Sequence, residues 1–510
     1  MKTYTFYIIL LAGSGLLSLQ ACKKTIDIAP IENNTSNSFY SNEIEVKQAV
    51  IGIYARLGRN GTNTDFATDY FWLASEDRSD LLYIAAETSA QNDQLELRKY
   101  LISPTSGTVS VIFSRLYQII KEANNLLYYT QDGEYMRYRA EASFLRAYAY
   151  SELARSFGPV ALITKPIENI EAVTLPRASL TDIYAQVISD LQYASANLEK
   201  VYTSADAGRI GSLAANALLG QVYMTMAGYP LNDATAYAKA ETVFAGIIND
   251  VATRFAPVYA DIFTLANENK YDLFSIQFTS GGVGTGSSLP GYITSSASTG
   301  SPFPEWTYST YTQQGQDLRV DSALVKDMKK NKDLRFSASI DTGYYNAVLT
   351  STNASTRTFV QRNIVTKFLE KDNTNSKIKS WNDFPRNFPI LRDADVYLLY
   401  AEALIKNGKA AMAKQYIDKI RTRAGLAVLA SNPTLDDIKA ERKYEFIGEG
   451  RRYFDLVRWG ETDAISTLAA SATHYHSLLN GQLPTKKDLL LPIPQNELKT
   501  RSNWDQNFGY

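Results

Sequence analysis

The sequence predicts a mostly α-helical fold, an irregular tetratricopeptide-like helical-repeat scaffold with long loops and a few short strands. Three observations support this prediction. The chain of 510 residues is 45% hydrophobic and 21% charged, which is apolar enough to bury a large core. Apolar residues recur at helical spacing in both the N-terminal half and the C-terminal third. Strand-like alternation is confined to short segments.

The first helix is expected at residues 43–57, where Val46, Val50, Ile53 and Leu57 share one face. Proline and glycine breakers separate the helical patterns that follow. These patterns cover residues 111–129, 135–157, 180–198, 212–226 and 233–248.

The C-terminal third repeats the pattern. Helices are expected at residues 393–406 and 410–423, joined by a turn at Asn407-Gly408, and a further helix at 435–448. Small residues would let the paired helices approach closely; they are Ala401, Ala403, Ala410 and Ala413.

Strand patterns are few, and the middle of the chain is unusual. Residues 272–278 alternate as a strand does, and residues 357–369 are expected to contribute a hairpin arm. Residues 273–304 carry no charged side chain and are rich in Gly, Ser and Thr. Because loops of this length inside a compact domain tend to be functional, a neutral ligand is expected to meet the protein here.

The N-terminus reads as an export signal that ends in a lipid anchor. An apolar stretch at residues 6–19 is shorter than a membrane-spanning helix requires. Leu19-Gln20-Ala21-Cys22 resembles the lipobox of bacterial lipoproteins, and the resemblance implies that Cys22 is acylated. We therefore expect a signal peptide at residues 1–21, a tether at 22–38 and a single domain at 39–510.

Charge and composition exclude several classes of function. The 52 basic and 53 acidic residues give a net charge of −1, so the chain has no overall positive field with which to bind nucleic acid. One cysteine and two histidines, His474 and His476, leave little for a metal site. No cofactor motif is present, and neither a metal nor a cofactor is expected.

Several segments occur in an order that resembles the SusD/RagB family of outer-membrane, glycan-capturing lipoproteins. The resemblance covers the chain from end to end. Its most specific part is Glu441–Phe446 followed by Glu449–Trp459. The other matching segments are Ile26–Pro30, Phe39-Tyr40, Ala140–Ala147, Phe157–Val160, Arg392–Ala403, Ile420–Gly425, Leu491–Pro494 and Gln506–Tyr510.

The resemblance implies a function and a partner. It implies a non-catalytic lipoprotein, lipid-anchored in the outer membrane and facing the cell exterior, that binds oligo- or polysaccharide. It also implies delivery of the glycan to a TonB-dependent, SusC-like transporter. Two alternatives keep the same scaffold: a peptide-binding, RagB-like protein, and a structural adaptor of the transporter that has no ligand of its own.

The ligand face is expected on two loop insertions, at residues 61–105 and 279–390. Sugar rings stack on aromatic side chains, and their hydroxyls pair with planar polar groups. The candidates in the middle insertion are Tyr292, Trp306, Tyr308 and Tyr311. The candidates after the first helix are Arg78, Asp80, Tyr83 and Asn92. Trp72, in an apolar run, is expected to belong to the core.

One cluster of carboxylates allows two interpretations. Glu441, Glu445 and Glu449 lie on one helix face, near Arg442, Arg451, Arg452 and Arg458 in the sequence. They could form a catalytic carboxylate pair or a structural ion-pair network. We favour the network, because nearby arginines would keep the carboxylates ionised and useless as general acids. The sequence contains no serine-elbow, zinc-protease or phosphate-loop motif either, so we do not expect an enzyme.

Overall fold

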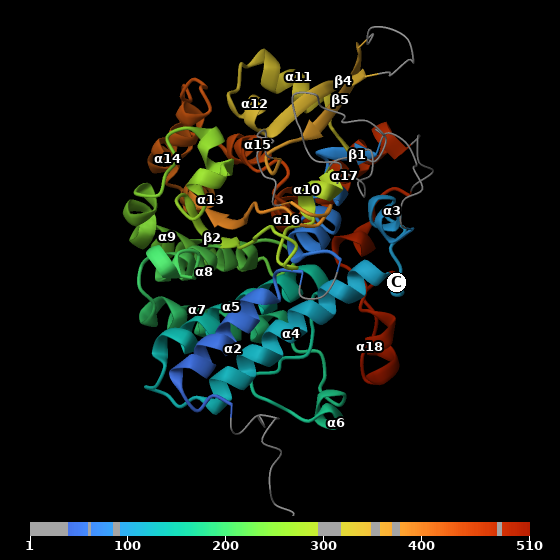
Figure 1. Cartoon of the computed structure of the whole chain (residues 1–510). Helices are drawn as coiled ribbons and strands as arrows, with labels where there is room; N and C mark the ends of the chain where they lie inside the picture. The colour runs from blue at the N-terminus through green and yellow to red at the C-terminus, as the bar shows by residue number, and fades with distance from the viewer. Residues whose placement is uncertain are drawn as a thin grey trace, which may run out of the picture.

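The computed structural model describes residues 39–59, 63–84, 92–293, 318–347, 357–369, 378–476 and 482–510. Helices make up most of it (Figure 1). No helix in these ranges is both long enough and apolar enough to cross a bilayer.

The helices of the N-terminal half pack against one another in the order in which they occur in the chain. They are α2 (Glu43–Ala55), α4 (Gly107–Tyr129), α5 (Met136–Phe157), α7 (Leu180–Asn197), α8 (Ser212–Ala227) and α9 (Ala236–Ala252). Side-chain caps fix two of the starts, because Asn42 accepts from Glu45 N and Ser179 accepts from Asp182 N, both at 3.1 Å. Helix α5 is buried at nearly every position and forms the centre of this half.

The C-terminal helices extend the same array. They are α13 (Asp393–Lys406), α14 (Ala410–Arg423), α15 (Leu435–Glu445), α16 (Arg452–Trp459) and α17 (Glu461–His476). Helix α13 packs on both α8 and α9, so the two halves share one core. Figure 1 shows α8, α9, α13 and α14 side by side on one flank of the molecule.

Close helix packing depends on a small residue between α8 and α9. A Cβ atom on Gly220 would lie 2.3 Å from the ring of Phe244, which is itself fully buried. No side chain fits there without moving one of the two helices. The predicted small residues Ala401, Ala403 and Ala413 are buried in the same way in the α13–α14 pair.

Within the described ranges, the strands form three two-stranded antiparallel sheets. Strand β1 (Leu82–Ile84) pairs with β3 (Leu318–Val320), β2 (Asp272–Ile276) with β6 (Phe388–Arg392), and β4 (Ile340–Ala347) with β5 (Arg357–Val365). Figure 1 places β4 and β5 at the end of the molecule opposite α2 and α4.

Short helical segments complete the structure. They are η1 (Ala67–Leu73), η2 (Glu76–Arg78), α3 (Asn92–Arg98), α6 (Asn169–Ala172), η3 (Ser204–Asp206), η4 (Tyr259–Phe263), η5 (Leu265–Asn267), α10 (Leu289–Ile293), α11 (Ser322–Lys330), α12 (Arg335–Ser339), η6 (Lys486–Leu489) and α18 (Gln495–Thr500).

The predicted fold class is confirmed, and each predicted helix is present with its ends shifted by a few residues. The shifts include a start of α4 at Gly107 and not at residue 111, and a start of α9 at Ala236 and not at Asp233. The Asp233 carboxylate accepts from Thr235 N at 3.0 Å and forms a turn ahead of the helix. The strand at 272–278 and the hairpin arm at 357–369 are confirmed as β2 and β5.

Candidate functional site

An open cleft with a volume of about 420 Å³ lies where β1, β3, β5 and α11 meet. Its walls combine an aromatic ring, three cationic side chains and an amide. The residues that line it are Tyr83, Arg319, Ser322, Val325, Lys326, Lys329 and Asn363. The middle insertion and the segment after the first helix both contribute residues to it.

Local structure places each of these side chains. Tyr83 lies directly opposite Arg319 in the β1–β3 ladder, so the ring and the guanidinium are cross-strand neighbours. The contributions of α11 follow the spacing i, i+3, i+4, i+7 and therefore share one helix face. The Asp321 carboxylate accepts from Leu324 N at 2.7 Å and fixes the start of that helix.

Asn363 forms the inner wall of the cleft. It lies in β5 beside a register shift in the β4–β5 ladder, and only 8% of it is exposed. Among the residues that the structure describes, no group forms a hydrogen bond with its side-chain oxygen Oδ1. A buried acceptor without a partner is costly, and such groups are rare in folded proteins. This oxygen can therefore accept a donor that a ligand brings into the cleft.

The two loop regions are joined by a buried carboxylate. Asp65, in the segment after α2, accepts through Oδ2 from Ser288 N at 2.6 Å, Ser288 Oγ at 2.9 Å and Ser287 Oγ at 3.1 Å. Its Oδ1 accepts from Thr68 N at 2.9 Å. Asn382 adds a further link, because its amide donates to Asn63 O at 3.0 Å. These bonds hold the segment after α2 and the middle insertion together.

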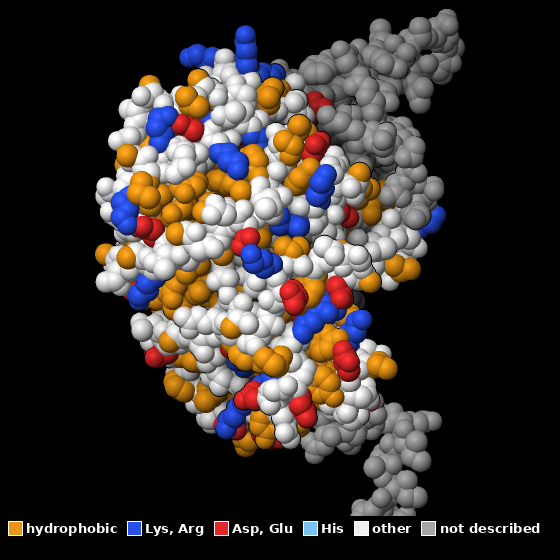
Figure 2. All heavy atoms as spheres, turned by 90° about the vertical axis from the view of Figure 1, so that its left-hand side faces the viewer, with side chains coloured by type: hydrophobic (Ala, Val, Ile, Leu, Met, Phe, Trp, Pro, Cys, Tyr) orange, Lys and Arg blue, Asp and Glu red, His pale blue; other side chains and the backbone are white. Residues whose placement is uncertain are grey.

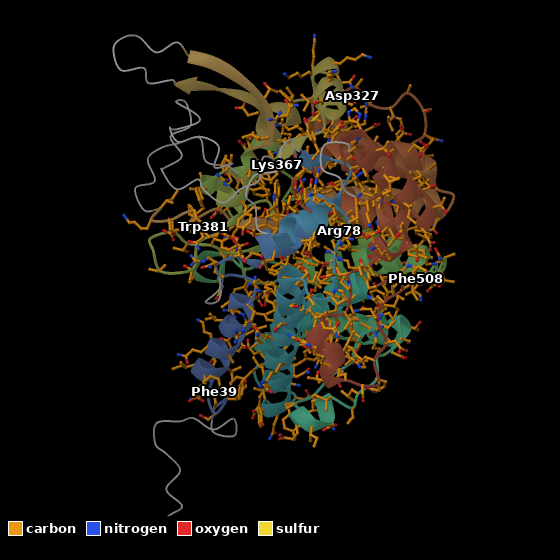
Figure 3. All side chains as sticks on the ribbon, turned by 90° about the vertical axis from the view of Figure 1, so that its right-hand side faces the viewer. Phe39, Arg78, Asp327, Lys367, Trp381 and Phe508 are labelled. Atoms are coloured by element: carbon orange, nitrogen blue, oxygen red, sulfur yellow. The ribbon has the colours of Figure 1, made fainter. Side chains whose placement is uncertain are left out.

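Trp381 is an aromatic residue of the middle insertion that was not among the predicted ligand contacts. It is half-buried and contacts Tyr292, with ring centroids 5.6 Å apart. Figure 3 places it on the side of the molecule from which β4 and β5 project. Its sequence context, Ser380-Trp381-Asn382 in a polar segment between two strands, was the signal that could have identified it. Tyr292 is 5% exposed, so it contacts Trp381 from the buried side of that ring.

Arg78 was predicted to contact the ligand, and that prediction is wrong. It is 2% exposed and lies within the body of the molecule (Figure 3). The guanidinium donates to Tyr453 Oη at 2.9 Å and to the carbonyl of Asp488, and it stacks on the Tyr453 ring at 4.3 Å. Arg78, the last residue of η2, therefore attaches η2 to α16 and η6.

The other candidates have different surroundings. Asp80 receives a bidentate pair of bonds from Arg452, at 2.7 and 2.9 Å, so its carboxylate is engaged in holding α16. Tyr83 is half-buried and lines the cleft. Asn92 is the first residue of α3. Trp306, Tyr308, Tyr311 and Cys22 lie outside the described residues.

Glu441, Glu445 and Glu449 form a structural ion-pair network, as predicted. The carboxylates are almost completely buried. Glu445 accepts from Arg392 and Arg423 at 2.6 Å each and from Arg335 at 3.2 Å. Burial alone would raise the pKa of Glu445, but the three arginines outweigh it and hold the pKa well below its ordinary value. A carboxylate without solvent access and fixed in the ionised state cannot act as a general acid.

The arginines that were expected beside these carboxylates have other partners. Arg452 pairs with Asp80 at 2.7 Å, and Arg442 pairs with Asp455 at 2.7 Å. Arg458 pairs with Glu402 at 2.6 Å. The structural ion-pair network is confirmed. The expected pairing of these arginines with Glu441, Glu445 and Glu449 is wrong.

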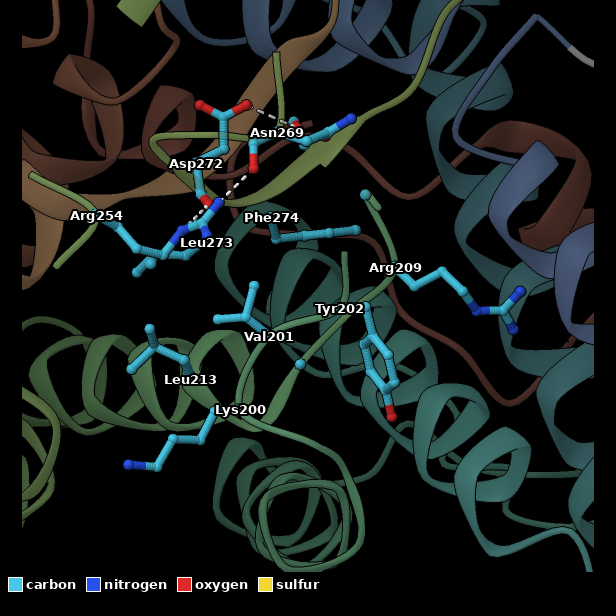
Figure 4. Close-up of a pocket in the computed structure, with 13 residues that line it drawn as sticks. Lys200, Val201, Tyr202, Arg209, Leu213, Arg254, Asn269, Asp272, Leu273 and Phe274 are labelled. Carbon is cyan, nitrogen blue, oxygen red and sulfur yellow. Dashed lines mark hydrogen bonds between the residues drawn. The ribbon is translucent and has the colours of Figure 1, made fainter. Parts of the chain in front are cut away.

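A second cavity, drawn in Figure 4, is too small for a sugar. Its volume is about 20 Å³, little more than one water molecule needs. Arg254 donates to Asp272 O at 3.0 Å, and the Asp272 carboxylate accepts from Ser275 Oγ at 3.0 Å. Burial raises the pKa of Asp272 to about 6. These contacts join β2 to the end of α9. Among the described residues there is no cluster of histidine, cysteine or acidic side chains that could hold a metal ion.

The fold and the cleft together define a helical-repeat protein with an open cleft between short strands and the helix α11. Two family models match the chain: the SusD family at residues 290–510, and the family described as starch-binding and associating with the outer membrane at residues 31–224. The chain belongs to the SusD/RagB family.

Known proteins resemble the chain over nearly its whole length. A SusD-like protein, P25, from Formosa agariphila is 27% identical over 489 residues, which covers 87% of this chain and 88% of that protein. A laminarin-binding SusD-like protein is 25% identical, with a TM-score of 0.73 and coverage of 92% and 100%. Surface glycan-binding protein A from Bacteroides thetaiotaomicron, solved with laminarihexaose, shares the fold at 23% identity, with a TM-score of 0.75 and coverage of 91% and 99%.

Proposed function

We propose that this protein is a non-catalytic glycan-binding protein that captures oligo- or polysaccharide in the cleft between β1, β3, β5 and α11. The observation that carries the proposal is the lining of the cleft, in which the Tyr83 ring, the Arg319 guanidinium and the Asn363 amide converge. Rings and planar polar groups of this kind recognise the apolar face and the hydroxyls of a sugar. The laminarin-binding relative supports the same ligand class.

Replacing Tyr83 by alanine is expected to weaken glycan binding at least about tenfold, because a stacking aromatic in a cleft is a typical hot spot. The test is calorimetry of the chain without residues 1–22 against a panel of glycans, supported by affinity electrophoresis. Tyr128→Ala is the matched control, since Tyr128 is 62% exposed near the end of α4, on a helix that does not line the cleft.

The same panel distinguishes the alternatives. Binding to peptides and to no glycan would identify a peptide-binding protein. Binding to neither class of ligand would support a structural adaptor of the transporter that has no ligand of its own. The appearance of new reducing ends would show that the protein is an enzyme, and any of these three results would contradict the proposal.

The proposed location is the outer membrane, with the protein anchored through Cys22, facing the cell exterior and delivering the glycan to a TonB-dependent, SusC-like transporter. The family description supports an association with the outer membrane. The helical array offers a surface for the transporter. Figure 2 shows the face that includes α9 and α14, where hydrophobic side chains gather between scattered charges of both signs. The exposed hydrophobic side chains include Met412 in α14, Val258 just before η4 and Leu334 just before α12.

Replacing Cys22 by alanine in the native cell is expected to move the protein from the membrane to the soluble fraction. Several acyl chains, each methylene contributing about 0.8 kcal/mol, hold a lipoprotein at a bilayer. Co-purification with a β-barrel transporter should fall in parallel, because the anchor keeps the two proteins at one surface. Unchanged membrane retention would contradict the anchor. If the wild-type protein is retained in the membrane but co-purifies with no β-barrel protein, the proposed transporter partner would be contradicted.

A further inference from the structure

The charge in the cleft is strongly one-sided. Arg319 on β3 and Lys326 and Lys329 on α11 all line it, and none of the described lining residues is acidic. The chain as a whole has a net charge of only −1, so three cations around one cleft are a local concentration of charge. A cleft of this kind attracts anions and stabilises them when they bind.

The carboxylates nearest in sequence have other roles. Asp321 caps α11 by accepting from Leu324 N at 2.7 Å. Asp327 accepts from the Tyr444 hydroxyl and from Asn331 Nδ2, the latter at 3.1 Å. Neither residue is among those that line the cleft.

Asn363 adds a second requirement. Its Oδ1 is buried and has no partner in the described part of the chain, so a ligand that satisfies it must donate a hydrogen bond. A fully ionised carboxylate or sulfate group only accepts hydrogen bonds, and it therefore satisfies the cations but not this oxygen. A sugar hydroxyl donates. The two requirements together describe one ligand that carries both negative charge and hydroxyl groups, and the Tyr83 ring adds a stacking surface.

We propose that the cleft selects acidic glycans, with a uronate carboxylate or sulfate ester facing Arg319, Lys326 and Lys329 and a neighbouring hydroxyl donating to Asn363 Oδ1. This inference rests on the proposed function and narrows its ligand class. It replaces the neutral ligand that the uncharged segment 273–304 led us to expect, because the charged walls come from residues beyond that segment.

Matched pairs of polymers test whether binding depends on the negative charge of the glycan. Polygalacturonate is compared with its carboxyl-reduced form, and a sulfated galactan with its desulfated form, by affinity electrophoresis and calorimetry of the chain without residues 1–22. The acidic member of at least one pair is expected to bind about tenfold more tightly, and raising the salt concentration should reduce that advantage. The pair that shows the difference identifies carboxylate or sulfate as the anion.

Two sets of variants link the preference to this cleft. Lys326→Gln/Lys329→Gln is expected to lower binding of the acidic polymer to the level of its neutral counterpart. The control Lys47→Gln/Lys499→Gln removes two exposed charges from α2 and α18 and should leave the preference unchanged. Asn363→Leu should weaken binding of both members of the pair, because it removes the acceptor for the hydroxyl and leaves the cations in place.

Results that would contradict the proposed function differ from those that would contradict only the acidic ligand. No binding to any glycan would overturn the proposed function itself. Neutral polymers that bind as tightly as acidic ones, or a preference that survives in Lys326→Gln/Lys329→Gln, would overturn the acidic ligand and leave glycan binding standing.

Discussion

Replacing Glu445 by glutamine is expected to destabilise the fold by about 3–5 kcal/mol, the usual cost of removing one partner from a buried charge network. Glu445 is fully buried, and it is the carboxylate shared by Arg335, Arg392 and Arg423. A neutral amide would leave these buried guanidinium groups with too little opposing charge and would present an N–H group where they need an acceptor. Urea denaturation of the two proteins measures the difference.

A surface pair provides the control. Glu461 and Lys486 lie 3.0 Å apart on side chains that are 31% and 53% exposed, so Glu461→Gln should cost at most about 1 kcal/mol. A loss of the same small size in Glu445→Gln would show that the network is not needed for stability.

The effect of Glu445 also has a defined pH dependence. Its pKa in the folded protein is lower than the ordinary value of 4.5, so its contribution is fully present above pH 4.5 and is lost as the pH falls through the depressed folded value. The stability difference between the wild type and Glu445→Gln should therefore be constant near neutrality and shrink in acid. A difference that grows in acid would contradict this assignment.

The helical scaffold could be predicted because its signal is local. Val46, Val50 and Ile53 repeat with the helical period, and all three are buried in α2. The cap at Asn42 and the turn at Asn407-Gly408, where Gly408 adopts a φ of 76°, are also encoded by neighbouring residues. The helix α11 was missed because it has only 9 residues, too few for a helical repeat to stand out.

Side-chain partners could not be predicted in the same way. Helical spacing places Glu441, Glu445 and Glu449 on one face but does not say what lies opposite. The partners Arg335 and Arg392 come from segments that lie more than fifty residues away in the chain and approach only in the folded structure. The arginines that are close in sequence point elsewhere, as Arg458 does toward Glu402.

The same limit applies to the cleft. Tyr83 was predicted as a ligand contact because an aromatic side chain on a loop suits a sugar, and the structure places it on the cleft wall. Arg78 matched the same composition, but its guanidinium is directed into the core. Lys326, Lys329 and Asn363 carried no sequence signal of their own, because a charged helix face and a strand amide are ordinary surface features until the fold brings them together.

Replacing Asp65 by asparagine is expected to separate the two loop regions that contribute to the proposed ligand-binding cleft. Its carboxylate accepts from Ser287 and Ser288 of the middle insertion and from Thr68 after α2, and it is fully buried. An amide keeps one acceptor oxygen and turns the other position into a donor that faces the Ser288 backbone N–H. Because hydrogen bonds to a charged group contribute about 1.5–3 kcal/mol, we expect a stability loss of that size.

Glycan binding provides the more specific measurement for Asp65. The residue does not line the cleft, so a loss of affinity in a variant that is still folded would show that it acts by positioning the loops. Asp182→Asn is the matched control, because Asp182 is exposed at the start of α7 and its own bonds run to Ser179. The control should keep both stability and affinity. If Asp65→Asn is destabilised but binds glycan as the wild type does, the link supports the fold and the cleft keeps its shape without it.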